Sequence, residues 1–307
     1  MEIDMDRSVN YDLVRNENAD PTDISFWLPV QIEDETEELS ISEVFNNEPK
    51  ENVFLLPVKI QSSNNNLSLS KILEKRSDDP LSDVTFLIPA HNEEKAIGRL
   101  VEQIKLWCSS RVIVVDNDST DKTAEVGRKH GAYVFPEKHR GKAHAVKKGF
   151  HNVKSKFAIM LDADFSYDPR DAEKLLQPLI NDEADVVMGS RIHGKRDDGA
   201  LPFLNLIANH VFSTTATLLY GRVSDVCTGY WAFKREVLQS LLKMGIDSTG
   251  FEIEAEMYAK LSQMGFRIVE VPIKYRQRVG TSKLNRTKDA IKIIRTFIAY
   301  KLLSHKP

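Results

Sequence analysis

Between residues 84 and 190, stretches with the pattern of buried strands alternate with stretches with the pattern of amphipathic helices. The expected strands are aliphatic runs at 84–88, 111–115, 133–135, 157–161 and 186–188. The expected helices between them cover 93–107, 123–130, 142–150 and 170–180. Such alternation is typical of an α/β fold, in which crossover units build a mostly parallel sheet with helices on both faces. Ligands of such sheets bind outside the carboxyl ends of the strands, so we examine the residues that follow each strand.

Two aspartates, Asp162 and Asp164, follow the strand expected at 157–161. Residues i and i+2 of an extended segment point to the same side, so both carboxylates can face one point. Two unpaired carboxylates this close repel each other, and a cation between them removes the repulsion. Mg²⁺ and Mn²⁺ take oxygen ligands, and Mg²⁺ is usually held by one or two carboxylates together with substrate phosphates. The alternative is that Asp164 or Asp168 caps a helix that begins near Pro169.

Polar residues also follow three other expected strands. They are Asn92 and Glu93 after the first strand, Asp116 and Asp118 after the second, and Arg191 after the strand at 186–188. Carboxylates and amides at neighbouring strand ends can hydrogen-bond a base and a ribose, and the guanidinium group of Arg191 can hold phosphate oxygens. Taken singly, Asn92 and Asp116 fit turn or cap positions equally well.

Composition and cysteine spacing indicate an ordinary globular protein. The 307 residues are 41% hydrophobic and 28% charged, which is enough for a sizeable core. Cys108 and Cys227 form neither a zinc-binding nor a disulfide pattern, which favours a reducing compartment. The acidic N-terminus has no apolar region of the kind found in secretory signals, and the apolar stretch 201–220 is too polar for a spanning helix. We therefore expect a cytoplasmic protein.

Charge is distributed unevenly along the chain. Residues 1–80 carry 7 Lys and Arg against 18 Asp and Glu, whereas residues 81–307 carry 35 against 27. A moderately basic segment suits a phosphate-bearing substrate or an anionic membrane surface. The excess is too small for a nucleic-acid interface, and no basic stripe with interleaved aromatic residues is present, so we expect no nucleic-acid partner.

The acidic segment contains an internal repeat with an offset of 28 residues. Residues 26–45 match residues 54–73, with identities that include the F-x-L-P-V pattern at the start of each copy. Each copy is expected to form a short strand, a polar connector and a Ser-capped turn or short helix. The alternative is a solvated acidic tail in which the similarity is accidental.

A basic amphipathic helix is expected at the C-terminus. Between residues 287 and 306, an apolar face of Ile291, Ile294, Phe297, Ile298 and Leu302 is surrounded by Lys288, Lys292, Arg295, Lys301 and Lys306. Such a helix can lie on an anionic membrane, although packing on the domain or on the partner in a homodimer fits as well. The expected organisation is an acidic module at 1–80, an α/β domain at 81–285 and this helix at 286–307.

Seven motifs occur in the second of these segments. They are IPAHNEE (88–94), VVDNDSTDKTAE (114–125), GKAHAVKKGF (141–150), LDADFSYDP (161–169), ADVVMGSR (184–191), DVCTGYWAFKREV (225–237) and EVPIKYRQRVGTSKLN (270–285). In this order they resemble glycosyltransferase family 2, and within it the polyprenyl- and dolichyl-phosphate sugar synthases. The resemblance runs from about residue 84 to residue 284 and implies the GT-A fold, a Rossmann-like, mostly parallel sheet flanked by helices, with a small N-terminal appendage.

The resemblance also implies roles for individual residues. Nucleotide-sugar binding is implied for Pro89, Ala90, Asn92, Glu93, Asp116, Asp118, Gly141, Lys142 and Asp162, and metal binding for Asp162 and Asp164. Catalytic roles are implied for Asp164, Arg191, Asp225, Arg276 and Lys283, of which the three basic residues match positions near the donor and acceptor phosphates. Three residues depart from the pattern: Asn117 replaces a second Asp, Ser166 a metal-contacting Gln of mannose synthases, and Trp231 a basic residue of many lipid-phosphate enzymes.

The implied reaction is inverting, metal-dependent transfer of a sugar from a UDP- or GDP-linked donor to a polyprenyl phosphate such as dolichyl phosphate, as in the synthesis of glycan precursors. Mg²⁺ or Mn²⁺ is the implied cofactor, and the enzyme is expected on the cytoplasmic face of a membrane. A phosphate monoester has a second pKa of about 6 and is already a nucleophile near pH 7. Glu254 is the first candidate base if the acceptor is a hydroxyl. Two alternatives are a soluble transferase with a small phosphorylated or saccharide acceptor, and a non-catalytic nucleotide-sugar-binding protein.

Overall fold

The structure is a computed structural model that describes residues 24–31, 53–60, 81, 83–281, 283 and 286–303. The chain divides into two compact units, Met1–Asp79 and Pro80–Pro307. In the first unit, β1 (Ile24–Gln31) pairs antiparallel with β2 (Val53–Ile60). These are the strand portions of the two repeats, whereas the expected connectors and short helices lie outside the described residues.

The second unit is built on a seven-stranded sheet in the order β5-β4-β3-β6-β8-β7-β9. Its strands are β3 (Val84–Ala90), β4 (Arg111–Asp116), β5 (Tyr133–Pro136), β6 (Phe157–Met160), β7 (Val186–Ser190), β8 (Trp231–Lys234) and β9 (Ile268–Pro272). In this sheet β8 runs antiparallel to β6 and β7, and the other neighbouring strands run parallel. The prediction of a mostly parallel α/β sheet is confirmed.

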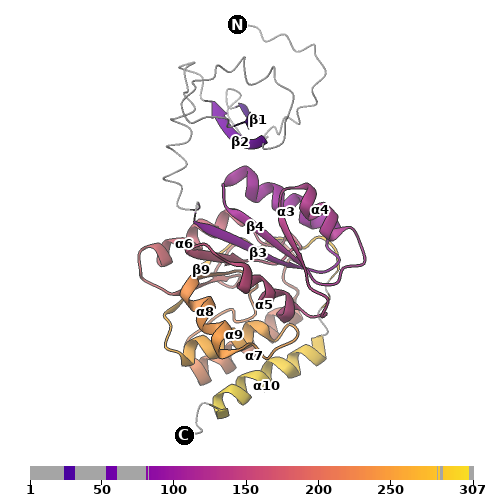
Figure 1. The fold of residues 1–307 in the computed structure, drawn as a ribbon. Helices are drawn as coiled ribbons and strands as arrows, with labels where there is room; N and C mark the ends of the chain where they lie inside the picture. The colour runs from indigo at the N-terminus through magenta and orange to yellow at the C-terminus, as the bar shows by residue number, and fades with distance from the viewer. Residues whose placement is uncertain are drawn as a thin grey trace. The chain divides into compact units, whose positions relative to one another are not determined.

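Helices cover both faces of the sheet (Figure 1). They are α3 (Glu94–Trp107), α4 (Thr123–Lys129), α5 (Lys142–Asn152), α6 (Ala172–Ile180), α7 (Phe203–Tyr220), α8 (Arg235–Met244), α9 (Ile253–Gln263) and α10 (Arg286–Leu303), and the short 3-10 helix η1 (Pro169–Asp171) precedes α6. Successive residues of a strand point to opposite faces. Accordingly, Phe86 and Ile88 of β3 join the apolar cluster under α3 and α6, while Leu87 joins the cluster under α5, α8 and α9.

Three strand ends lie together at one edge of the sheet. Ala90, the last residue of β3, pairs with Asp116, the last residue of β4. The backbone N–H of Asn117 donates to the carbonyl of Ala90 at 2.7 Å, and that of Leu161, after β6, donates to the carbonyl of Leu87 at 3.1 Å. The turns that follow β3, β4 and β6 are therefore neighbours, as expected for parallel strands.

The C-terminal helix α10 packs on α7 and α9. Its expected apolar face is divided, because Phe297 is fully buried while Ile291, Ile298 and Leu302 are exposed. On α7, Phe203 and four other large apolar side chains are also exposed. Among the helices of the described residues, none has the length and apolar character needed to cross a membrane.

Candidate functional site

The turns after β3 and β4 are tied together by Asn92 and Glu93. Asn92 has a φ of 53°, in the left-handed region that Asn tolerates better than most residues. Its backbone N–H donates to Ser119 Oγ at 2.9 Å, and its Oδ1 accepts from the N–H of Thr120 at 2.8 Å. The backbone N–H of Glu93 donates to Thr123 Oγ1 at 2.8 Å. Asn92 thus occupies a turn position, which was the alternative to a role in ligand binding.

Asp116 contributes an unpaired oxygen to this edge. Its Oδ1 atom is buried and has no hydrogen-bond partner among the described residues. A buried polar atom without a partner costs free energy, so it points to a group supplied by a ligand. Pro89 and Ala90 are buried strand residues opposite Val115 and Asp116, whereas Asp118 is half exposed and lies 4.0 Å from Arg140 Nε.

Lys142, at the start of α5, lies between two carboxylates. Its Nζ is 2.6 Å from Asp162 Oδ1 and 2.6 Å from Glu254 Oε1. Burial alone would lower the pKa of Lys142, but the two carboxylates raise it, so the ammonium stays charged. Burial raises the pKa of Glu254. Gly141 has a φ of 133°, and a Cβ there would overlap the carbonyl oxygen of Thr249, so this position requires glycine.

Asp162 and Asp164 have different partners. Asp164 Oδ1 accepts from the N–H of Ser166 at 3.0 Å and from its hydroxyl at 2.5 Å, and Asp164 Oδ2 lies 3.1 Å from Arg278. Asp162 packs against Gly229, where a Cβ would lie only 2.7 Å from its Cγ. Each carboxylate therefore faces its own cation, Lys142 or Arg278.

The two aspartates fit a divalent cation that is bound together with a substrate. Among the described residues, no group of three or more His, Cys, Asp or Glu could hold a metal ion. The protein can therefore offer Asp162 and Asp164, and Gly229 keeps the side of Asp162 free of a side chain. A pair of carboxylates completed by phosphate oxygens and water is the usual environment of Mg²⁺.

Residues 276–281 and Lys283 lie against the turns after β3 and β6. The N–H of Val279 donates to the carbonyl of Asp164 at 2.9 Å. Lys283 Nζ donates to the carbonyl of Asn92 at 3.0 Å and forms an ion pair with Glu93. Arg278 lies 3.9 Å from Glu93, and its Nε atom is buried without a partner among the described residues. Burial raises the pKa of Glu93 despite these cations.

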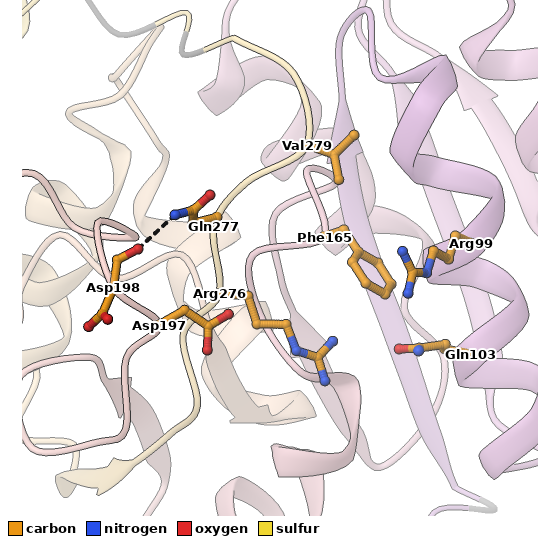
Figure 2. Close-up of a pocket in the computed structure, with 8 residues that line it drawn as sticks. All are labelled: Arg99, Gln103, Phe165, Asp197, Asp198, Arg276, Gln277 and Val279. Carbon is orange, nitrogen blue, oxygen red and sulfur yellow. Dashed lines mark hydrogen bonds between the residues drawn. The ribbon is translucent and has the colours of Figure 1, made fainter. Parts of the chain in front are cut away.

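Arg276 contacts different residues from those that Lys283 and Arg278 contact. It pairs with Asp168 and lies 5.4 Å from the centroid of the Phe165 ring, which Arg99 of α3 approaches at 4.5 Å (Figure 2). An open cavity of about 540 Å³ is lined by Arg276, Phe165 and Arg99 together with Gln103, Asp197, Asp198, Gln277 and Val279. Phe165 has a φ of 65°, a strained conformation for a bulky residue. Asp168 caps η1, as its alternative role predicted.

Arg191 and Asp225 form a buried pair. Arg191 Nε and Nη2 donate to the Asp225 carboxylate at 2.8 and 2.7 Å, and the backbone N–H of Arg191 donates to it at 2.8 Å. Glu270 accepts from the backbone N–H of Asp225 at 2.9 Å, and Arg191 lies 5.3 Å from the Tyr275 ring centroid. Asp225 therefore orients Arg191.

Several residues of this region have no sequence signal of their own. Gly229 and Phe165 matter through contacts with distant parts of the chain, which no local pattern reveals. Two of the departures from the family pattern find structural roles: Ser166 binds Asp164, whereas Trp231 is fully buried and donates from Nε1 to the carbonyl of Thr228 at 2.7 Å. Trp231 is thus a core residue.

Comparison with known proteins identifies relatives of the second unit. The family model described as Glycosyl transferase family 2 matches residues 85–242. Glycosyltransferase AglJ of Haloferax volcanii is 33% identical over 204 residues, which is 66% of each chain. The dolichyl-phosphate hexose transferase of the same organism is 35% identical, over 66% of this chain and 87% of the relative. The match to the hexosyltransferase Agl6 spans only 52% of that relative.

Two further comparisons extend this picture. Polyprenol monophosphomannose synthase of Mycolicibacterium smegmatis is 27% identical over 67% of this chain and 82% of the relative. A structure of glucosyl-3-phosphoglycerate synthase from Mycobacterium tuberculosis with Mn²⁺, UDP-glucose and phosphoglyceric acid superimposes with a TM-score of 0.59. It covers 78% of this chain and 86% of its own, at 18% identity, which shows a common fold.

Proposed function

The chain belongs to glycosyltransferase family 2, and on that premise we propose that this hexosyltransferase moves a sugar from a nucleotide-diphosphate donor to a polyprenyl phosphate. The observation that carries the proposal is a pair of buried polar atoms without partners among the described residues, Asp116 Oδ1 and Arg278 Nε. The first is an acceptor, suited to the donor groups of a base or ribose. The second is a charged donor beside Asp164, suited to a phosphate oxygen.

The paired charges around Asp162 and Asp164 support a metal–diphosphate complex as the ligand. Lys142 and Arg278 now neutralise the two carboxylates. A divalent cation bound to Asp162 and Asp164 would release Arg278 to face the diphosphate, while Lys142 would stay paired with Glu254 beside it. When bound, the metal stabilises the negative charge that develops on the departing nucleoside diphosphate. Mn²⁺ in the M. tuberculosis structure supports the same metal class.

The chain's own residues would position the reactants and neutralise charge. Glu93 pairs with Lys283 and Arg278 and so holds both basic side chains against the turn after β3. The acceptor phosphate attacks the sugar C1 as its bond to the diphosphate oxygen breaks, so the electron pair leaves with the nucleoside diphosphate. A phosphate that is already ionised near pH 7 needs no general base. Glu254 is engaged in an ion pair with Lys142, which agrees with a reaction in which Glu254 is not needed as a general base. Attack from the opposite side of C1 would invert the anomeric configuration.

A lipid acceptor is supported by the relatives' names and by the surface of α7 and α10. Both helices expose large apolar side chains, and Lys292, Arg295 and Arg222 beside them are exposed. Apolar side chains with a basic border are typical of helices that lie in the plane of an anionic membrane surface. We therefore place the enzyme at a membrane surface as a peripheral protein.

A small phosphorylated acceptor is the second candidate. The cavity in Figure 2 favours it, because Arg99 and Arg276 flank the Phe165 ring directly after Asp164. The M. tuberculosis neighbour is described with phosphoglyceric acid. Organic extraction separates the two candidates, since a polyprenyl-linked sugar enters the organic phase and a sugar linked to a small acid does not.

A radiolabel-transfer assay tests the proposal. Wild type, Asp164→Ala and the surface control Glu236→Ala are incubated with polyprenyl phosphate, Mg²⁺ or Mn²⁺, and labelled UDP- or GDP-sugars. We expect label in the organic phase with wild type and Glu236→Ala, and a loss of about 100-fold or more with Asp164→Ala. Label that stays in the aqueous phase as a new product would favour the small acceptor. Donor binding without any transfer would favour a non-catalytic nucleotide-sugar-binding protein.

A further inference from the structure

The side chain of Asn117 connects three backbone groups of one loop. Asn117 follows β4 and is 5% exposed. Its Nδ2 donates to the carbonyl of His139 at 2.6 Å and to that of Glu137 at 3.4 Å, and its Oδ1 accepts from the N–H of Gly141 at 2.7 Å. These three residues belong to the loop 137–141, which joins β5 to α5. One amide therefore fixes both ends of the loop.

The loop carries groups from two parts of the site. Arg140 reaches the β3 and β4 turns, where its Nη2 lies 2.6 Å from His91 Nε2 and its Nε 4.0 Å from Asp118. Gly141 sets the start of α5, and the next residue, Lys142, bridges Asp162 and Glu254. The loop thus places Arg140 beside the turns after β3 and β4, and places Lys142 between Asp162 and Glu254.

The contacts of Asn117 require an amide. An ionised carboxylate only accepts hydrogen bonds, whereas the Asn side chain both donates and accepts. The N–H of Gly141 needs the oxygen, so the nitrogen must face the two carbonyls. An ionised aspartate at 117 would place a negative oxygen against two carbonyl oxygens and repel the loop. A protonated aspartate could still donate to His139 and accept from Gly141.

We propose that Asn117 is a positioning residue that sets the loop 137–141 for binding of the nucleotide diphosphate and that acts only as an amide. The identity of the ligand rests on the proposed function, whereas the effect on the loop does not. Asn117 couples the base end of the site, at Asp116, to the diphosphate end, at Lys142.

Nucleotide affinity measured as a function of pH tests whether position 117 requires an amide. Isothermal titration calorimetry measures the affinity of UDP and of GDP, with MnCl₂, for wild type, Asn117→Asp, Asn117→Ala and the control Asn152→Asp between pH 5.5 and 8. Asn152 donates to the carbonyl of Lys148 at the end of α5, away from the loop. We expect Asn117→Asp to bind about 10-fold more weakly than wild type at pH 8. The ratio should shrink toward pH 5.5, where the buried carboxyl protonates. Asn117→Ala should stay weaker at every pH, and Asn152→Asp should match wild type.

A second measurement does not depend on any nucleotide. Hydrogen exchange of the nucleotide-free protein, read at the Gly141 amide, should be about 10-fold faster in Asn117→Ala than in wild type, with Asn152→Asp unchanged. Unchanged exchange at Gly141 would overturn the proposal, and so would an Asn117→Asp variant that binds as wild type at every pH. A wild type that binds neither UDP nor GDP while Gly141 exchange responds would count against the proposed function and leave the loop-setting role in place.

Discussion

Gly229 limits what can stand beside Asp162. A Cβ atom on Gly229 would lie 2.7 Å from Asp162 Cγ and 2.8 Å from its Oδ1. Asp162 is also held by Lys142, so it cannot move away without disturbing that ion pair. Gly229→Ala is therefore expected to lower kcat/KM by about 100-fold, because displacements near 1 Å at a reacting centre have effects of this size. It should also raise the metal concentration needed for half-maximal transfer, measured by titrating Mn²⁺.

Gly149 provides a matched control. It is buried in α5, where a Cβ would lie 2.7 Å from Leu87 Cδ2, in the core and away from the aspartates. Gly149→Ala should lower Tm through this crowding while leaving the metal requirement unchanged. If Gly229→Ala instead showed the wild-type metal requirement with only a lowered Tm, Gly229 would be a packing position and no part of the metal site.

A second prediction at the scale of single side chains concerns the stability that the Arg191–Asp225 pair provides. Asp225 is completely buried and Arg191 nearly so. Asp225→Asn removes the negative charge and leaves the guanidinium buried without compensation, which costs about 3–5 kcal/mol in the free energy of unfolding. Urea unfolding measures this value. The control Asp198→Asn, at an exposed position, should change the free energy of unfolding by less than about 0.5 kcal/mol. An equally small change in Asp225→Asn would show that other groups stabilise the charge of Arg191.

The edge of the sheet between β7 and β9 is held by a charge cluster that titrates. Hydrogen bonds from Arg267, at 3.0 and 2.7 Å, hold the pKa of Asp185 well below its usual range, and Lys234 adds a contact at 2.9 Å. A depressed carboxyl pKa stabilises the fold above the unfolded-state pKa, about 3.9, and this contribution is lost as pH falls toward the folded-state value.

Asp185→Asn should therefore lower Tm by a few degrees at pH 7, an amount kept small by the exposure of Arg267. The difference from wild type should shrink progressively below about pH 4, because Asp185 then protonates in the unfolded state while it stays ionised in the folded protein. Thermal unfolding followed by circular dichroism from pH 7 down to pH 2.5 measures the Tm difference at pH 7 and its change with pH. A difference that stays constant over this range would assign the effect to lost packing and not to the charge.

Strands with a strong local pattern were predictable, and those fixed by pairing were not. Phe86, Leu87 and Ile88 are consecutive, apolar and fully buried, the signature of a parallel strand covered on both faces. The four-residue β8 contains a similar buried run, Trp231, Ala232 and Phe233, but its antiparallel direction and its place in the sheet have no local signal. Its place between β6 and β7 comes from pairing Trp231 with both Met160 and Met188, which local sequence does not encode.

The same distinction applies to the site. Asp162 and Asp164 were found because their spacing is local, and the clustering of Asp116 with them follows from parallel strands. The partners of Arg276 depend on the path of residues 276–281, which brings Arg276 to Asp168 and Arg278 to Asp164. Extended segments of similar composition give no sign of which of two nearby arginines will face which carboxylate.

The basic second unit and its apolar helices together suggest where the enzyme acts. Tyr220 of α7 donates to the carbonyl of Phe297 of α10, and Lys301 lies 5.8 Å from the Tyr220 ring centroid, so the two helices form one continuous surface. Phe203 is 73% exposed, Leu218 81% and Leu302 68%, which is unusual for side chains of this size.

Insertion of these side chains into a membrane predicts a specific dependence on lipid and salt. Wild type should co-sediment with vesicles of phosphatidylcholine and phosphatidylserine, less with phosphatidylcholine alone, and less as NaCl screens the basic residues. Phe203→Ser combined with Leu302→Ser should reduce the membrane partition coefficient by about 100-fold or more, because each loses about 1.5–3 kcal/mol of burial. Transfer to a short-chain, water-soluble polyprenyl phosphate should be unchanged. A double variant that still binds vesicles but no longer self-associates in gel filtration would assign the surface to a dimer interface.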